Sequence, residues 1–497
     1  MGDIKEKFKQ DFEKANNVDL SFDVEKLEPN TKKSRHKIRP YKKVLIFGAV
    51  AMASVVVIVS IPAGMLLIRT KESVRTYRRF YSMNETSLAE ANTVRKLNLV
   101  GYPNQERPTK SILDENEKNA YGNFSNATYH GLVDSSKKDN MSYAVVGLYS
   151  MLNELEEATS NDDLNARLNE LLGQDKEGRK TLYRKIMRAN SFSKDTSSIQ
   201  LKNAAFFHNE YRYSQAYVDT LSNMYCEAYQ LDFAKDAGKI VEWVNKAVDS
   251  QGFIDENYLN IDSESQLYLL STLFFKNAWM SKYLSENNIV DDFFLENGSA
   301  VKTTYMSHTY YDSRYYDYGS YISFRDYYQN GNASVTYIVP KDAKDNIYDL
   351  TKNENIFIDK EENKIEAEEY SRFKINLKTP KFAFKTDIDF ENALKHLGFA
   401  DIFNKTVNSF GNAFDDENLA KDNLNIYLQQ MKQRNEVEFN EDGSIVKSLS
   451  LSGLGAGSAA PMKNNTLDVE LNQPFIYIIR DINDTPIFVG HVDNPII

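Results

Sequence analysis

Cysteine and histidine, two residue types that often act in catalysis or bind metal ions, are few in this chain and are scattered along it. The only cysteine is Cys226. A single cysteine excludes an intrachain disulfide and a zinc site built on cysteines, and we expect its thiol to be buried or half-buried. The six histidines match no catalytic or metal-binding spacing: they are His36, His130, His208, His308, His396 and His491. The sequence therefore predicts no enzyme, no metal site and no cofactor.

The chemistry of interest lies in a stretch of small residues between Glu438 and Pro474. A strand with one face of small side chains is predicted after Gly443 because the residues alternate with a period of two. One set is Ser444, Val446, Ser448, Ser450 and Ser452, and the other is Ile445, Lys447, Leu449 and Leu451. Residues 453–460 are nearly all Gly, Ala or Ser, which predicts a loop. Loops longer than about 12 to 15 residues in a compact domain are usually functional or disordered. We therefore expect this stretch to carry the function of the protein.

Composition and charge limit the classes of partner. The chain has 497 residues, 41% of them hydrophobic, so it can bury a large core. Residues 1–43 carry a net charge of +4, residues 44–68 carry no charge, and the remainder carries −15. Nucleic-acid binding needs a basic face for the phosphates. We therefore expect no nucleic-acid partner for the large C-terminal part.

A membrane-spanning helix is predicted at residues 44–68. These 25 uncharged residues make a helix of about 37 Å at about 1.5 Å per residue, enough to cross a hydrocarbon core with some tilt. The segment is too long and begins too late for a cleaved secretory signal. Its N-terminal flank has seven cations and no acid, and its C-terminal flank has five cations and one acid, Glu72. This bias predicts a signal-anchor with a cytoplasmic N-terminus, a single pass through the cell membrane and an extracellular C-terminal part.

The remaining segments divide by composition. Residues 1–43 are polar and charge-rich, which predicts a mostly disordered tail. Residues 69–114 include the breakers Pro103 and Pro108 and are predicted to form a stalk. Residues 115–497 show no further shift in composition and no repeat, so we expect one domain there.

Apolar spacing within residues 115–497 indicates both helices and strands. Helical spacing appears in residues 143–155 and 240–248, and also after Asp389, which can cap a helix. The apolar run 267–275 predicts a strand buried on both faces. Further strands are predicted at 335–339 and in a hairpin formed by 475–479 and 487–492. Helices grouped between strand pairs predict an α+β fold.

Several motifs in this region resemble the serpin family. The stretch 240–254, Ile-Val-Glu-Trp-Val-Asn-Lys-Ala-Val-Asp-Ser-Gln-Gly-Phe-Ile, is similar to a serpin helix that ends in a turn, and Leu-Phe-Phe-Lys-Asn-Ala-Trp at 273–279 is similar to the strand that follows it in that family. The sequence Glu441, Asp442, Gly443 and Ser444 occupies the position of the serpin Glu-Glu-Gly-Thr hinge. Further matches fall in the family order: 231–233, 380–382, 397–398, 402–403, 473–475, 488–490 and 494–495. The resemblance covers residues 115–497.

The resemblance implies a fold, a function and a site. The fold would be a serpin-like single domain of about eight to nine helices around three β-sheets, with an exposed reactive loop near the C-terminus. The protein would be a monomeric suicide inhibitor of serine or cysteine proteases, whose loop is cut and then inserts into a central sheet. Trp279 would lie where the loop enters the sheet, or be one more buried aromatic residue. The inserting face would be Ser444, Val446, Ser448 and Ser450.

Two positions for the scissile bond stay open. The family spacing counted from the hinge places the bond between Gly457 and Ser458, whereas the spacing counted back from Pro474 places it after Lys463. A bond at Gly457 would suit proteases with small specificity pockets. Met462 or Lys463 would suit chymotrypsin-like or trypsin-like proteases.

The chain also departs from the family pattern at positions that govern sheet opening. The alanine-rich run after the hinge is replaced by Val446 to Leu449, Ser271 stands where an asparagine is usual, and Gln433 stands where a histidine is frequent. The Ser-Pro-x-Ser motif is missing near residues 141–144. The alternative is therefore a non-inhibitory serpin-like surface-binding protein whose loop is only cleaved or never engaged.

Sequons for N-glycosylation are a further feature. Nine Asn-x-Ser/Thr sequons occur between Asn84 and Asn483. They could be glycosylated in a eukaryotic secretory route. In a chain this rich in asparagine, chance explains most of them.

Overall fold

A computed structural model gives the fold of the C-terminal unit of the chain. It describes residues 94–102, 105–135, 139–194, 197–250, 252–261, 265–311, 313–342, 345–365, 372–415, 425–444 and 464–496. The chain divides into the units Met1–Ala89 and Glu90–Ile497, and all described residues belong to the second. The predicted tail and the predicted membrane helix at residues 44–68 lie outside the described residues. No helix within the described ranges is long and apolar enough to cross a membrane.

The largest sheet has eight strands and contains the start of the small-residue stretch, Gly443 and Ser444. Its strands lie in the order β1, β5, β4, β6, β15, β14 and β13, and β3 pairs with β4. Strands β4 and β5 are parallel, whereas β4 and β6 are antiparallel. The bounds are β1 Arg95–Lys96, β3 Ser191–Lys194, β4 Ser197–His208, β5 Cys226–Leu231, β6 Leu267–Ala278, β13 Phe382–Asp389, β14 Lys432–Asn440 and β15 Gly443–Ser444.

Two smaller sheets complete the β-structure. The six-stranded sheet has the order β2, β18, β17, β11, β10, β9, and every residue of β11 and β17 is buried, as expected for central strands. Its bounds are β2 Met141–Tyr143, β9 Tyr315–Asp317, β10 Tyr321–Tyr327, β11 Ala333–Pro340, β17 Phe475–Asp481 and β18 Pro486–Val492. The four-stranded sheet has the order β16, β12, β8, β7. Its bounds are β7 Ile289–Phe294, β8 Ala300–Tyr311, β12 Arg372–Pro380 and β16 Asn464–Glu470.

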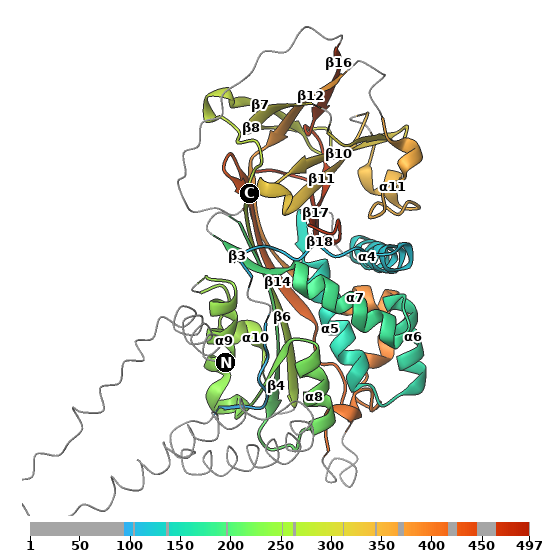
Figure 1. Ribbon diagram of the computed structural model, residues 1–497, viewed down its shortest axis with the longest axis vertical. Coiled ribbons are helices and arrows are strands. Elements are labelled where there is room, and N and C mark those ends of the chain that lie inside the picture. The colour runs from blue at the N-terminus through green and yellow to red at the C-terminus, as the bar shows by residue number, and fades with distance from the viewer. Residues whose placement is uncertain are drawn as a thin grey trace, which may run out of the picture. The chain divides into compact units, whose positions relative to one another are not determined.

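Nine α-helices within the described residues surround these sheets. Figure 1 shows α9 and α10 on one side of the largest sheet and α5, α7 and α8 on the other. The helices are α4 Glu115–Ser135, α5 Val145–Ala158, α6 Asp162–Leu172, α7 Lys176–Ala189, α8 Gln215–Asn223, α9 Phe233–Ala247, α10 Glu256–Leu259, α11 Ile347–Thr351 and α12 Glu391–His396. Short 3₁₀ helices span Ser285–Asn287, Gln329–Gly331, Glu361–Asn363, Ala400–Phe403 and Gly411–Ala413. The predicted α+β class, three sheets and eight to nine helices are confirmed.

Local sequence explains where several helices begin and end. Asp232 caps α9 because its carboxylate accepts hydrogen bonds from the N–H groups of Ala234 and Lys235. Asn161 caps α6 in the same way, and Gly173 ends that helix in the left-handed conformation, φ 73°. Helix α5 is buried along nearly its whole length, so it forms the centre of the main core between the two larger sheets.

One element differs from the sequence expectation. The run 267–275 was expected to be buried on both faces, and β6 does contain it, but most residues of β6 are half-buried. β6 is half-buried because most of its edge toward β14 has no neighbouring strand in the described part of the chain. Within the described residues, only the two-residue strand β15 pairs with that edge.

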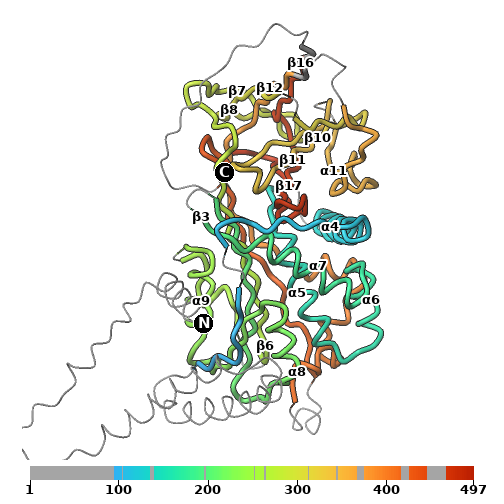
Figure 2. The backbone as a smooth tube through the Cα atoms, in the orientation of Figure 1, coloured from blue at the N-terminus to red at the C-terminus, as the bar shows by residue number. Residues whose placement is uncertain are grey.

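Part of the predicted stalk packs on the domain. Arg95 and Lys96 pair with β5, and the Tyr102 hydroxyl donates to the carbonyl oxygen of Asn203 at 3.0 Å. Figure 2 shows these first described residues, in blue, running along the largest sheet before the chain enters α4.

Candidate functional site

The largest sheet contains a reversal of the chain at its centre. β14 ends at Asn440, Glu441 and Asp442 form a turn, and β15 returns between β14 and β6. Ser444 pairs with Phe439 of β14 and with Asn277 of β6. The four predicted hinge residues, 441–444, therefore lie together where a strand enters the sheet.

The close approach of the backbone at position 443 requires glycine. Gly443 has φ 150°, and a Cβ atom placed there would lie 2.1 Å from the carbonyl oxygen of Asn277. Any larger residue would push β15 away from β6. Gly443 thus permits the first step of strand addition.

Charged and polar groups hold the turn in place. Asn288 Nδ2 donates to Glu441 Oε1 at 2.5 Å, Lys381 Nζ lies 3.0 Å from Glu441, and Lys282 Nζ lies 2.7 Å from Asp442. Burial by itself raises the pKa of Glu441, but hydrogen bonds from a backbone N–H, Asn288 and Lys381 outweigh burial and hold the pKa below its ordinary value. Glu441 is therefore ionised and paired at neutral pH.

Trp279 lies beneath the same turn. Its indole Nε1 donates to the carbonyl oxygen of Asn440 at 2.8 Å, and its ring stacks on Tyr328 with centroids 4.6 Å apart. The Tyr328 hydroxyl lies 2.7 Å from Ser444 Oγ, and Ser444 is 1% exposed. The structure thus brings Trp279 and Ser444 into one buried cluster. Ser444 faces inward, as the alternating pattern requires.

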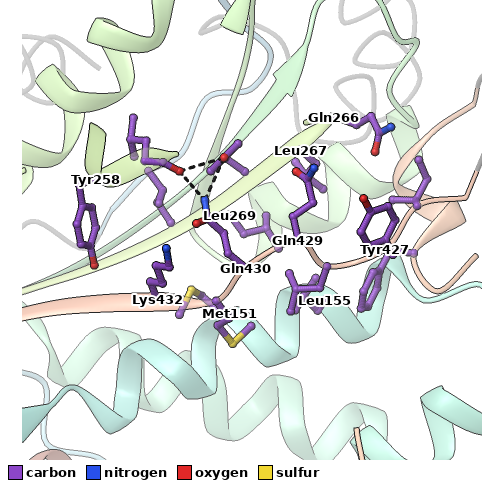
Figure 3. Close-up of a pocket in the computed structure, with 17 residues that line it drawn as sticks. Met151, Leu155, Tyr258, Gln266, Leu267, Leu269, Tyr427, Gln429, Gln430 and Lys432 are labelled. Atoms are coloured by element: carbon purple, nitrogen blue, oxygen red, sulfur yellow. Dashed lines mark hydrogen bonds between the residues drawn. The ribbon is translucent and has the colours of Figure 1, made fainter. Parts of the chain in front are cut away.

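Beyond Ser444, strands β6 and β14 form what we call the β6–β14 seam, the stretch over which they do not pair with each other. Within the described residues the two strands are joined only through β15. A cavity of about 100 Å³ lies at the far end of the seam. Figure 3 shows Met151 and Leu155 of α5 on one side of it, with Leu269 of β6 and Gln430 on the other. The seam is therefore a place that can accept a strand.

In the middle of the seam, the polar side chains of Gln433 and Ser271 are not hydrogen-bonded to each other. Gln433 of β14 exchanges hydrogen bonds with Ala144, whose N–H donates to Gln433 Oε1 at 2.7 Å and whose carbonyl oxygen accepts from Nε2 at 3.2 Å. Ser271 Oγ of β6 is buried and has no hydrogen-bond partner in the described part of the chain. At the far end, however, Gln430 Nε2 donates to the Tyr268 hydroxyl at 3.0 Å. Among the described residues, no side-chain hydrogen bond therefore joins Ser271 to Gln433 in the middle of the seam, whereas one joins Gln430 to Tyr268 at its far end.

The next described strand after Ser444, β16, belongs to a different sheet. β16 begins at Asn464 and pairs in parallel with β12 of the four-stranded sheet. The remaining predicted site residues lie between Ser444 and β16 and outside the described residues, so they stay predictions: Val446, Ser448, Ser450, Gly457, Ser458, Met462 and Lys463.

The single cysteine can be placed as well. Cys226 is buried, as predicted. No group of three or more His, Cys, Asp or Glu side chains within the described ranges is placed to hold a metal ion.

The sequence missed several groups that contact the hinge. Tyr328, Asn288 and Lys282 belong to no motif that was recognised, and the cavity residues of α5 looked like ordinary core. Lys381 lies in the recognised 380–382 motif, but nothing local indicates that it pairs with Glu441. No spacing signal links residues so far apart along the chain.

The fold and the hinge define a class of protein in which the chain leaves one sheet at the central strand β15 and is next described at β16, the edge strand of another sheet. Residues 119–495 match the family described as Serpin (serine protease inhibitor). The chain therefore belongs to the serpin family, a family of protease inhibitors and not of enzymes.

Similar proteins extend this comparison. Serpin-Z4 of Hordeum vulgare is 27% identical over 275 residues, which cover 52% of this chain and 63% of that protein. Alpha-1-antitrypsin 1-2 of Mus musculus is 23% identical over 387 residues, covering 75% and 88% of the two chains. The crystal structure of the thermophilic serpin Tengpin in the native state aligns with a TM-score of 0.67 at 20% identity, covering 80% of this chain and 100% of Tengpin.

Proposed function

We propose that the protein is a membrane-anchored inhibitor of serine endopeptidases that acts as a suicide substrate. The protease cleaves the loop between Ser444 and Asn464 and remains attached to it as an acyl-enzyme while the loop inserts into the β6–β14 seam. One observation carries the proposal: β15 already occupies the first two strand positions between β6 and β14.

The register of β15 predicts how insertion continues. If both pairings extend one residue at a time, Ser450 falls between Ser271 of β6 and Gln433 of β14. Ser271 Oγ would then gain a hydrogen-bonding neighbour that it lacks in the structure. The hydroxyl of the inserted Ser450 would thus lie in the middle of the seam, where Ser271 and Gln433 are not hydrogen-bonded to each other.

The same register leads the strand into the cavity. Ser452 falls between Leu269 and Met431, and Leu454 falls between Leu267 and Gln429. All four of these strand neighbours line the cavity. The alternating pattern of the sequence and the position of the cavity therefore agree on one inserted strand, residues 443–454, which would be about 40 Å long at about 3.3 Å per residue.

The length of this strand bears on the scissile bond. Gly457 follows the last position opposite β6 by three residues, so a protease attached there would be drawn against the far end of the sheet. A protease attached to Lys463 would keep a nine-residue tether that transmits less tension. The register thus favours the bond between Gly457 and Ser458, and proteases with small specificity pockets.

The location we propose is the cell surface. The uncharged segment 44–68 and its flanking cations support a single-pass signal-anchor with a cytoplasmic tail and an extracellular inhibitory domain. The inhibitor would then act on proteases near the membrane.

The test is to mix the detergent-solubilised full chain with elastase, subtilisin, trypsin and chymotrypsin and to run denaturing gels with mass spectrometry. We expect an adduct that survives denaturation, together with a released C-terminal peptide beginning at Ser458. Cleavage without an adduct would overturn trapping and leave the non-inhibitory surface-binding function.

A further inference from the structure

Among the Asn-x-Ser/Thr sequons whose side chains the structure describes, two differ from the rest in how those side chains are bonded. Each lies at an exposed turn, and in each the third residue donates both its N–H and its hydroxyl to the oxygen of the asparagine side chain. The two asparagines are Asn297 and Asn404.

Asn297 lies at the tip of the hairpin between β7 and β8. Ser299 N and Ser299 Oγ lie 3.0 and 2.6 Å from Asn297 Oδ1. Gly298, at φ 81°, allows the tight reversal, and residues 296–300 are all exposed. Within the described residues Asn297 Nδ2 has no hydrogen-bond partner, so this amide nitrogen faces solvent.

Asn404 follows the short 3₁₀ helix Ala400–Phe403. Thr406 N and Thr406 Oγ1 lie 3.0 and 2.9 Å from Asn404 Oδ1. Asn404, Lys405 and Thr406 are all exposed. Its Nδ2 likewise has no partner in the part of the chain that the structure describes. The geometry of Asn297 thus recurs at an unrelated place in the fold.

Two of the other sequons use the asparagine to hold the domain together. Asn140 Nδ2 donates to the Asn494 carbonyl at 2.6 Å, and Asn140 Oδ1 accepts from the N–H groups of Asp493 and Asn494. Asn483 Oδ1 accepts from Ser111 N, and its Nδ2 is buried. A glycan on either nitrogen would have no room in the folded domain.

Three more sequons are also engaged or partly buried. Asn332 Nδ2 donates to Ser197 Oγ at 3.2 Å, and Asn126 Oδ1 is buried. Asn123 is exposed on α4, but the hydroxyl of its partner Ser125 donates to the Tyr121 carbonyl within the helix. None of the three combines an exposed turn with a free amide nitrogen.

We infer that Asn297 and Asn404 are N-glycosylation sites of the extracellular domain. The inference rests on the proposed topology, because sugar transfer takes place on the lumenal side of the secretory membrane. The co-reactant is an oligosaccharide carried on a lipid diphosphate. Nδ2 of the asparagine attacks the anomeric carbon of the sugar and forms a C–N bond. The C–O bond between the sugar and the diphosphate breaks, and the lipid diphosphate leaves. The proton from Nδ2 passes to a base of the transferase.

The experiment expresses the full chain in cultured insect or human cells and maps each sequon. Membranes are isolated, glycans are removed by peptide N-glycosidase in ¹⁸O-water, and peptides are read by mass spectrometry, so that each asparagine is scored separately. We expect ¹⁸O to be incorporated at Asn297 and Asn404 and not at Asn140, Asn332 or Asn483. N297Q and N404Q each remove one glycan on a gel, as do S299A and T406A, which keep the asparagine.

A protease-protection assay on sealed microsomes separates the two ways to fail. If the domain is protected but Asn297 and Asn404 carry no glycan, the inference is wrong and the topology stands. If the domain is digested from outside, the proposed topology is wrong and the inference falls with it. Neither result bears on whether the loop traps a protease.

Discussion

In the mechanism that we propose, Ser444 is the residue that sets the face of the inserting strand. Its side chain is buried against Tyr328, and the pairing with Asn277 and Phe439 defines which later residues face inward. A change at this position therefore acts on insertion and not on recognition of the loop by the protease.

Replacing Ser444 with arginine should abolish trapping and leave loop cleavage intact. An unpaired buried charge costs several kcal/mol, and each 1.4 kcal/mol corresponds to about a tenfold change in rate. Insertion should therefore slow by more than about tenfold, and gels should show cleaved inhibitor with no adduct. I445R is the matched control, since Ile445 belongs to the outward set. A trapping S444R variant would show that the register is wrong.

Lys447 should interact with β14 during insertion. The register places it next to Glu436, which is part-exposed and pairs with Lys385 in the structure. Exposed pairs contribute about 0.2 to 1 kcal/mol, so K447E should slow insertion by up to about fivefold. The double variant K447E/E436K should recover part of this loss. Trp279 at the hinge provides a fluorescence signal for the rate. Strictly additive effects of the two substitutions would contradict the pairing.

At the scale of elements, helix α5 supports the seam from below and carries an unusual acid. Glu154 is fully buried, and its Oε1 atom lies 3.5 Å from the Tyr183 hydroxyl. Burial raises its pKa from 4.5 to about 8, although hydrogen bonds from Cys226 and Tyr183 oppose the shift. Glu154 is therefore protonated in the folded protein at neutral pH.

This acid should make the stability of the domain depend on pH. Between pH 4.5 and about 8, Glu154 keeps its proton in the folded state and loses it in the unfolded state. The free energy of unfolding therefore falls as pH rises through this range and levels off above it. The slope should be about 1.4 kcal/mol per pH unit. E154Q should flatten it in urea titrations between pH 5 and 9, whereas the exposed control E170Q should not. An unchanged slope in E154Q would contradict the assignment.

The elements that could be predicted are those with a regular apolar pattern. Helices α5 and α9 and the hairpin β17–β18 follow from spacing, because a helix face or a buried strand repeats over neighbouring residues. The half-buried state of β6 did not follow, since it depends on what lies beside the strand. The residues that contact the hinge could not be predicted for a related reason. Lys381, Tyr328 and Asn288 lie 60, 116 and 153 residues along the chain from the hinge residues that they contact.

At the scale of the whole molecule, the unpaired seam leaves a more stable arrangement available. An inserted strand would pair on both sides with β6 and β14 and would fill the cavity beside α5. Each intramolecular hydrogen bond contributes about 1 kcal/mol net. Loop cleavage by itself should therefore raise the melting temperature, and S444R should not show this rise. Calorimetry before and after limited proteolysis measures the difference.

The central claim is that the cleaved loop occupies the β6–β14 seam in one register. A cysteine pair at positions 271 and 450 tests it directly, because directly opposed antiparallel residues are close enough for a disulfide. We predict that S271C/S450C forms no crosslink in the intact protein and forms one after loop cleavage, with S271C/L449C as the outward-facing control. A cleaved S271C/S450C protein that stays uncrosslinked, or one in which the control crosslinks equally well, would contradict the account.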